Sequence, residues 1–174
     1  MKWLSQDFES LHSLYINQLR VLLDAEEQIV RGLPVMITHV ADDELRRALQ
    51  MHLEESNEHI KRLEQILAAE KSVDPSVDDI SPAKCKAVAA LKAEVEDMIT
   101  DARDAWVRDA ALIGVAQRIE HYEMASYGTV RQWALVLGEA STAAILDKTL
   151  KEEGNADHLL TSISERINVQ ARAA

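Results

Sequence analysis

Residues 112–137 read LIGVAQRIEHYEMASYGTVRQWALVL, and this stretch decides the fold class. Its apolar residues recur every three or four positions, which is the period of one face of an α-helix. They are Leu112, Ala116, Ile119, Met124, Tyr127, Val130, Ala134 and Leu137. Gly138 follows at the position where a left-handed residue commonly closes a helix. We therefore predict a helix of about seven turns that is closed by Gly138.

The same periodicity predicts three more long helices, at residues 5–38, 43–71 and 141–170. Asp42 and Asp43 offer an N-cap and an acidic first turn for the second of these helices. Residues 71–82, KSVDPSVDDISP, have the composition of a loop, and a shorter helix is expected at 83–102. The chain is thus predicted to be all-α, a single domain over residues 1–174. Its architecture would be an antiparallel four-helix bundle with a long crossover that carries a fifth, short helix.

The composition excludes several classes of protein. Hydrophobic residues make up 47% of the 174 residues, with 5 Gly and 3 Pro, which favours long helices over a turn-rich β fold. The net charge of −11 argues against nucleic-acid binding, because phosphate contacts need a dense basic patch. We expect no membrane span and no signal peptide, hence a cytoplasmic protein. The lone Cys85 is expected to be an ordinary small residue on the short helix.

Every predicted long helix interrupts its apolar stripe with acidic residues. The helical period points six carboxylates inward, those of Glu26, Glu55, Glu120, Glu123, Glu153 and Asp157. His52 and His59 share the row of Glu55, at three residues before it and four after it. Glu152 lies about 100° around its helix from Glu153 and is expected to be solvated.

Counting residues from the two predicted helix turns places these acids at one level. Glu26 and Glu55 lie about 14 and 15 residues on either side of the first turn, which is a depth of roughly 21 to 23 Å. Glu123 and Glu153 flank the second turn at about the same depth, roughly 22 Å. In helices roughly 45 Å long this level is the middle of the bundle. We therefore expect these four acids to converge.

Inward carboxylates at one level need a counter-charge, because burying and crowding them costs several kcal/mol per ion, to order of magnitude. No inward set of Lys or Arg is evident at this level. A pair of divalent cations would balance the charge, and protonation of several acids is the competing solution. Oxygen-rich sites with few imidazoles suit iron or manganese, with zinc as an opportunistic occupant. The ferritin-like pattern has Glu-x-x-His on two helices. Here His59 follows Glu55 by four residues, and Asp157 takes the place of the second histidine.

Four segments, taken in order, resemble the YciE/YciF family of bacterial stress-associated ferritin-like proteins. They are DAEEQI (24–29), HLEESNEHI (52–60), AQRIEHYEMASYGT (116–129) and LKEEGNADHLL (150–160). The resemblance implies a ferritin-like bundle, a homodimer, a role in the stress response and a di-iron centre that oxidises iron. The matching inward acids are Glu26, Glu55, Glu120, Glu123, Glu153 and Asp157. His59 stands where such proteins often have glutamine, so its role as a ligand is predicted from its spacing.

The first functional hypothesis is a redox enzyme that reduces O₂ or H₂O₂ with two Fe²⁺ ions. Glu55 and Glu153 would bridge the ions and be the catalytic ligands, while Glu26 and either Glu120 or Glu123 would hold them terminally. A manganese catalase is a variant, although its usual histidine ligands are poorly represented. The second hypothesis is a structural or interaction bundle whose metal is only structural or absent. An iron-storage cage ranks third, because no sequence feature identifies the surfaces of a closed shell.

A homodimer is expected for a second reason besides the family resemblance. The chain has three tryptophans, Trp3, Trp106 and Trp133. These large apolar side chains exceed what one narrow bundle readily buries, and exposed apolar patches often mark interfaces.

Overall fold

The computed structural model describes residues 8–74, 77 and 79–173 of the chain. Five α-helices and no strand are found in this part of the chain. They are α1 (Leu11–His39), α2 (Asp43–Val73), α3 (Lys86–Asp101), α4 (Ala105–Val136) and α5 (Ala140–Arg172). The predicted all-α fold class is therefore confirmed, and none of the described helices is long and apolar enough to cross a membrane.

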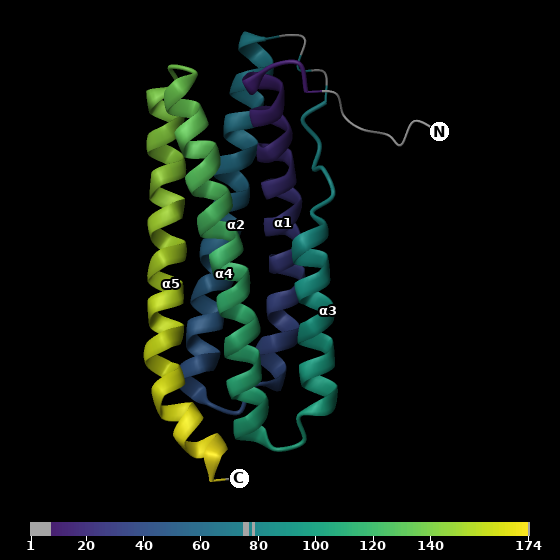
Figure 1. Ribbon diagram of the computed structural model, residues 1–174, viewed down its shortest axis with the longest axis vertical. Coiled ribbons are helices and arrows are strands. Elements are labelled where there is room, and N and C mark those ends of the chain that lie inside the picture. Colours follow the sequence, from purple (N-terminus) through teal and green to yellow (C-terminus); the bar gives the residue numbers. More distant parts are fainter. Residues whose placement is uncertain (1–7, 75–76, 78, 174) are drawn as a thin grey trace, which may run out of the picture.

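The four long helices form two antiparallel hairpins, α1 with α2 and α4 with α5 (Figure 1). The connection from α2 to α4 runs along the bundle and carries α3, which packs against α1 and α4. Because of this crossover, α2 and α4 point in the same direction. One long crossover between two helical hairpins is the ferritin-like arrangement, as predicted.

The helix ends follow local capping chemistry. Ser10 and Ser13 form a capping box at the start of α1, and residues 5–7 of the predicted helix lie outside the described residues. Gly138 has φ 87°, and Glu139 N–H donates to the carbonyl of Ala134 at 2.8 Å. This is a Schellman closure of α4, as predicted for Gly138. The prediction for Cys85 was wrong in one respect, because it is the N-cap of α3 and lies outside the helix.

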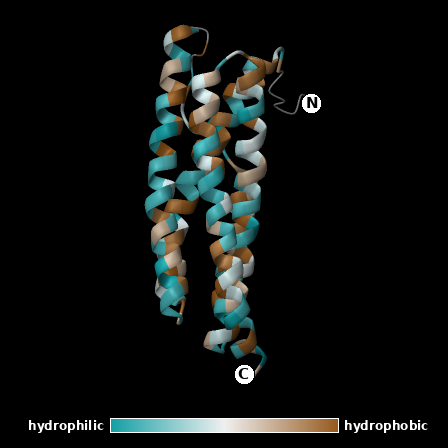
Figure 2. Ribbon diagram, turned by 90° about the vertical axis from the view of Figure 1, so that its left-hand side faces the viewer, coloured by the Kyte–Doolittle hydropathy of each residue, from teal (hydrophilic) through white to brown (hydrophobic). Residues whose placement is uncertain are grey.

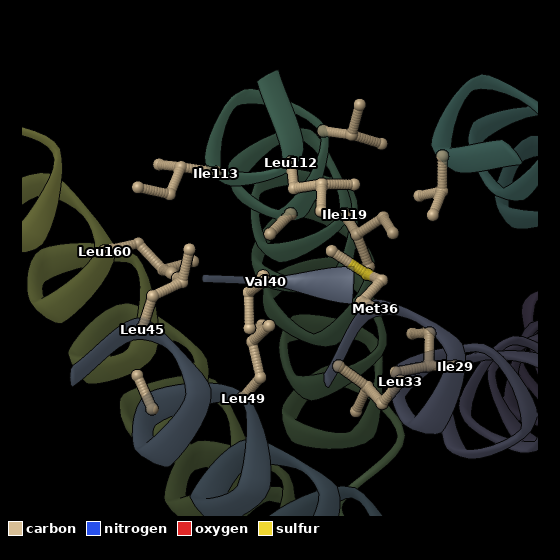
Figure 3. Close-up of a cluster of buried hydrophobic side chains, with 14 of the residues drawn as sticks. Ile29, Leu33, Met36, Val40, Leu45, Leu49, Leu112, Ile113, Ile119 and Leu160 are labelled. Atoms are coloured by element: carbon tan, nitrogen blue, oxygen red, sulfur yellow. The ribbon is translucent and has the colours of Figure 1, made fainter. Parts of the chain in front are cut away.

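The interior of the bundle contains two separate apolar clusters. The hairpin cluster surrounds the α1–α2 turn and includes Leu33, Met36, Leu45, Leu112 and Leu160, which point toward one another in Figure 3. The crossover cluster fills the other end and includes Leu19, Leu22, Leu63, Val130 and Leu146. Hydrophobic and hydrophilic residues alternate along the helices, as their colours show in Figure 2, so each helix buries one stripe.

The bundle itself accommodates two of the three tryptophans. Trp106 packs against the hairpin cluster and Trp133 against the crossover cluster, and both are partly buried. Trp3 lies outside the described residues. These two side chains therefore do not by themselves require a partner subunit. The homodimer stays a prediction.

A buried carboxylate fixes the turn between α1 and α2. Asp109 of α4 is fully buried and accepts hydrogen bonds from the backbone N–H of Ala41 at 3.0 Å and of Asp42 at 2.8 Å. Asp42 in turn caps α2 through the N–H groups of Glu44 and Leu45, and Arg166 of α5 binds both its oxygens. One end of the bundle is thus tied together by polar contacts to three helices.

Replacement of Asp109 by alanine should destabilise the fold by about 2–3 kcal/mol, because it leaves buried backbone N–H groups without an acceptor. Urea denaturation followed by circular dichroism measures this change. The exposed Asp101 supplies the control, since Asp101→Ala should change the free energy of unfolding by less than about 0.5 kcal/mol. Equal stability of the two variants would contradict the role assigned to Asp109.

Candidate metal centre

A layer of buried polar side chains separates the two apolar clusters. Its members are 0–5% exposed and come from all four long helices: Glu26, His52, His59, Glu120, Glu123 and Glu153. On each of these helices the layer lies between the segment that enters the hairpin cluster and the segment that enters the crossover cluster. The helices therefore bring these residues to one level, in the middle of the bundle.

Two groups of possible ligands meet in this layer, and each group can hold a metal ion. The first consists of His52, Glu120, Glu123 and Glu153, and the second of Glu26, His59 and Glu153. Within each group, one ligand atom per residue lies within 4.8 Å of all the others. Glu153 belongs to both groups, so it is the residue that two ions could share.

The contacts of Glu153 show how one carboxylate serves both groups. Its Oε1 lies 3.0 Å from His59 Nδ1, and its Oε2 lies 4.0 Å from His52 Nδ1. His59 Nδ1 is also 3.2 Å from Glu26 Oε1, and His52 Nε2 is 3.4 Å from Glu120 Oε1. Ligand atoms about 2.0–2.2 Å from one ion are typically about 2.8–3.6 Å from one another. Most of these separations already fit a shared ion.

An outer carboxylate orients the His59 ring. His59 Nε2 lies 3.0 Å from Glu152 Oε2, and Arg62 pairs with the same carboxylate. Burial alone would raise the pKa of Glu152, but the hydrogen bonds from Arg62 and His59 outweigh it and lower the pKa. A ligand histidine commonly donates its second N–H to a carboxylate, which fixes the tautomer and leaves the other nitrogen for the metal. The expectation that Glu152 is solvated was therefore wrong.

A tyrosine orients Glu26 in a similar way. The Tyr127 hydroxyl donates to Glu26 Oε1 at 2.6 Å, and both side chains are buried. Burial raises the pKa of Tyr127, and the charge of Glu26 adds to this shift, so the hydroxyl keeps its proton and remains a donor. The other oxygen of Glu26, Oε2, has no hydrogen-bond partner in the described part of the chain.

Burial sets the protonation of the remaining acids. It raises the pKa of Glu120 and Glu123 well above the ordinary value, and the charge of nearby Glu153 raises both further. Burial also raises the pKa of Glu153 to about 7, although the hydrogen bond to His59 opposes this shift. Without a cation in the layer, these carboxylates hold protons near neutral pH.

The two histidines respond to burial in opposite ways. Burial lowers the pKa of His52 to about 4, so its ring is neutral at pH 7 and both nitrogens are possible ligands. For His59 burial also acts to lower the pKa, but hydrogen bonds to Glu153 and Glu26 raise it to about 10. His59 is thus the internal cation of the metal-free layer.

Comparison with known proteins identifies the family. Residues 10–173 match the family described as "Domain of unknown function (DUF892)". The chain belongs to this family. It is 34% identical over 158 residues to Protein YciF of Escherichia coli (strain K12), covering 91% of this chain and 92% of YciF. The YciE/YciF resemblance predicted from the sequence is therefore confirmed.

Two solved structures of similar proteins share the fold. That of the E. coli stress protein YciF has a TM-score of 0.85 at 34% identity, over 92% of this chain and 98% of that one. YcfI from Rhodopseudomonas palustris, for which a structural role has been suggested, has a TM-score of 0.84 at 33% identity. That match covers 91% of this chain and 98% of YcfI.

The donor set of this DUF892 family member fits a pair of divalent metal ions. It comprises four carboxylates and two imidazoles, which is also the inventory of the ferritin-like di-iron pattern. The four carboxylate charges equal the charge of two divalent cations. Several of the buried ligand atoms lack a hydrogen-bond partner within the described residues, including both oxygens of Glu123 and both nitrogens of His52. Such orphaned atoms are costly unless a cation or a proton compensates them.

The structure brings most of the predicted ligands together and leaves two outside. Glu26, His59, Glu120, Glu123 and Glu153 are all members of the two groups. Glu55 lies about 60–70° around α2 from the centre of the buried row and is only half-buried. Asp157 lies about 40° around α5 from Glu153 and accepts a hydrogen bond from Gln117 at 3.0 Å. Neither residue belongs to the two groups, so their roles as ligands stay predictions.

His52 belongs to the first group of possible ligands, although the sequence predicted it only as a member of the row on α2 and not as a ligand. A signal was present in the sequence, since His52, Ser56 and His59 stand at i, i+4 and i+7 and share one face of a helix. All three are buried in the structure, with Ser56 fully enclosed.

An apolar cavity of about 90 Å³ adjoins the His52 end of the centre. It lies among α1, α2, α3 and α4, and His52 and Glu120 form part of its wall. Apolar residues in the lining include Ile29, Leu33, Met36, Leu49, Val95 and Ile119. The exposed residues Arg31 and Glu96 also line it, which places its outer end at the surface. The lining is therefore mostly apolar and also includes the charged residue Lys92.

Loading the centre with divalent ions should release protons, and affinity should rise with pH. Metal ions require deprotonated ligands, whereas Glu120 and Glu123 have raised pKa values and His59 is protonated through its pKa of about 10. Calorimetric titration with Zn²⁺ in buffers of different ionisation enthalpy, between about pH 6 and pH 8, measures the protons released. Uptake without proton release, at an affinity independent of pH, would contradict this protonation scheme.

Proposed function

We propose that this protein binds two iron ions in the polar layer and oxidises Fe²⁺ with O₂ or H₂O₂. The observation that carries the proposal is the position of Glu153, whose two oxygens face two histidine-carboxylate groups. The E. coli relative is called a stress protein, and we extend a role under oxidative stress to this chain as part of the same proposal. Manganese fits the same donors and is the alternative metal.

Each residue of the layer has an assigned role in this proposal. Glu26, His59 and Glu153 would hold one ion, and His52, Glu120, Glu123 and Glu153 would hold the other. Tyr127 and the Glu152–Arg62 pair hold Glu26 and His59 in orientation, as outer-shell partners do in metal centres. The Glu55 bridge expected from the sequence is replaced by His52 as a terminal ligand.

The chemistry that bound iron supplies is electron transfer. With peroxide the reaction is H₂O₂ + 2 Fe²⁺ + 2 H⁺ → 2 H₂O + 2 Fe³⁺, and with dioxygen it is O₂ + 2 Fe²⁺ + 2 H⁺ → H₂O₂ + 2 Fe³⁺. Four buried carboxylates favour the more highly charged ferric product, because charge interactions are strong where water is excluded. The surrounding apolar clusters exclude that water.

The apolar cavity supports redox chemistry over a purely structural metal. A structural metal site is usually closed, whereas a catalytic site keeps access for a small reactant. Here the cavity reaches from the surface to His52 and Glu120. The structural role suggested for YcfI keeps the second hypothesis in view, that of a bundle whose metal only holds the helices together.

In Glu153→Ala, iron loading and oxidation should both fall by more than the roughly 10–100-fold that loss of an outer-shell partner costs. The fold should survive without metal, because the cationic His59 ring keeps Glu26 as its other buried carboxylate partner. Anaerobic Fe²⁺ loading with elemental analysis, followed by the optical change on adding oxidant, measures both quantities.

The control for this variant is Glu165→Ala, because Glu165 is an exposed residue of the same helix. Glu152→Ala is unsuitable, since Glu152 contacts His59. If Glu153→Ala binds and oxidises iron as Glu165→Ala does, the centre is misassigned. If Glu153→Ala loses metal but the wild-type protein oxidises no iron with either oxidant, the second hypothesis, a structural metal, stands.

Filling the cavity should separate oxygen access from metal binding. Val95→Phe adds a ring inside the cavity and should slow oxidation by O₂ several-fold, with anaerobic metal loading unchanged. Stopped-flow absorbance compares this rate with that of Val107→Phe, a substitution at an exposed position of α4. An equal rate in both variants would show that O₂ does not use this cavity.

A further inference from the structure

We propose that the protein has a second metal site, where a divalent cation such as Zn²⁺ binds His12, Glu70 and Glu139. These residues come from the first turn of α1, the last turns of α2 and the residue that precedes α5. One ligand atom of each lies within 4.8 Å of the other two. We call this group the end site.

The contacts of His12 give the end site the form of a ligand cluster. His12 Nε2 lies 3.2 Å from Glu70 Oε2, a separation that fits two ligands of one ion. Its other nitrogen, Nδ1, lies 3.8 Å from Asp74 Oδ2. An outer carboxylate on the second ring nitrogen is the usual partner of a metal-bound histidine. An imidazole with two carboxylates suits Zn²⁺, Fe²⁺ or Mn²⁺.

A fully buried tyrosine points to a ligand at the same place. Tyr15 is 0% exposed, and its hydroxyl has no hydrogen-bond partner of acceptable geometry among the described residues. Burial raises its pKa, and the charges of Glu139 and Glu70 raise it further, so both acids lie near the hydroxyl. Glu139 Oε2 is a second buried atom without a partner. A cation between the acids would compensate both orphaned oxygens.

Charge also favours a cation at the end site. Among the residues that the structure describes, the titratable groups around it include His12 and Tyr15 from α1, Glu70 and Asp74 from α2, and Glu139 before α5. Burial and the hydrogen-bonded neighbour Glu70 raise the pKa of Glu139 to about 7. Two adjacent carboxylates with one histidine leave excess negative charge, which a divalent ion neutralises.

The end site is separate from the candidate metal centre. His12 and Glu26 are 14 positions apart on α1, which is about 21 Å along the helix. The crossover cluster fills the space between the two levels. An ion at the end site would join the beginning of α1, the end of α2 and the beginning of α5, so it would stabilise the folded chain by linkage.

Zinc binding to full-length chains with a disabled centre tests this inference. In Glu153→Ala, calorimetry should detect an ion that is lost when Glu139→Gln or His12→Gln is added. Zn²⁺ at about 100 times its Kd should raise the melting temperature of Glu153→Ala by about 5–10 °C. It should leave both double variants unchanged. Glu139 makes no side-chain capping bond to α5, so Glu139→Gln is expected to fold.

The control is Glu153→Ala with Glu165→Gln, which should bind and respond like Glu153→Ala alone. Equal Zn²⁺ binding in all variants, or no Zn²⁺ binding in Glu153→Ala, would overturn the proposal. A third outcome would also overturn the proposal, namely that Glu139→Gln raises the melting temperature and that no variant responds to Zn²⁺. This outcome would show that Glu70 and Glu139 only share a proton. None of these results bears on iron oxidation, so the proposed function stands or falls separately.

Discussion

The fold depends on compensation of the carboxylates in the middle of its core. Four glutamates without solvent contact would repel one another and lose their hydration, which costs several kcal/mol per ion, to order of magnitude. In the metal-free chain, protons on the acids and the positive charge of the His59 ring compensate this cost. Bound metal ions would also compensate it and would add ligand bonds. An apolar cluster lies on each side of the layer, so this compensation has to come from groups within the layer.

The ligand inventory matches the ferritin-like pattern, but its distribution over the helices differs. In that pattern each of two helices supplies one histidine. Here both histidines come from α2, at His52 and His59, and α4 supplies two glutamates. The residue of α2 that shares this face with the two histidines is Ser56, which is fully buried and has no carboxylate. Glu153 is thus the one carboxylate shared by both groups, and Glu152 with Arg62 secures the histidine beside it.

The two ends of the bundle are held by different chemistry. At the α1–α2 turn, Asp109 accepts hydrogen bonds from backbone N–H groups, and Asp42 accepts hydrogen bonds from Arg166. Hydrogen bonds therefore compensate both buried carboxylates at this end. At the opposite end, Tyr15 and Glu139 keep orphaned oxygens next to Glu70. This contrast between two polar clusters of one chain distinguishes a structural network from a possible ligand site.

The sequence by itself determined the helices, the crossover and the level at which Glu26, Glu123 and Glu153 meet. Helical period and rise are properties of the backbone, so counting residues is enough to find a depth. Only the tertiary structure decided which residues beside these acids face inward. The rotation of α2 is set by packing against its neighbours, and it turns His52 inward while Glu55 stays at the edge. In the same way Asp157 binds Gln117, and Glu152 joins Arg62 of another helix. Such long-range partners leave no trace in the local spacing, because the contacts form between residues far apart in the chain.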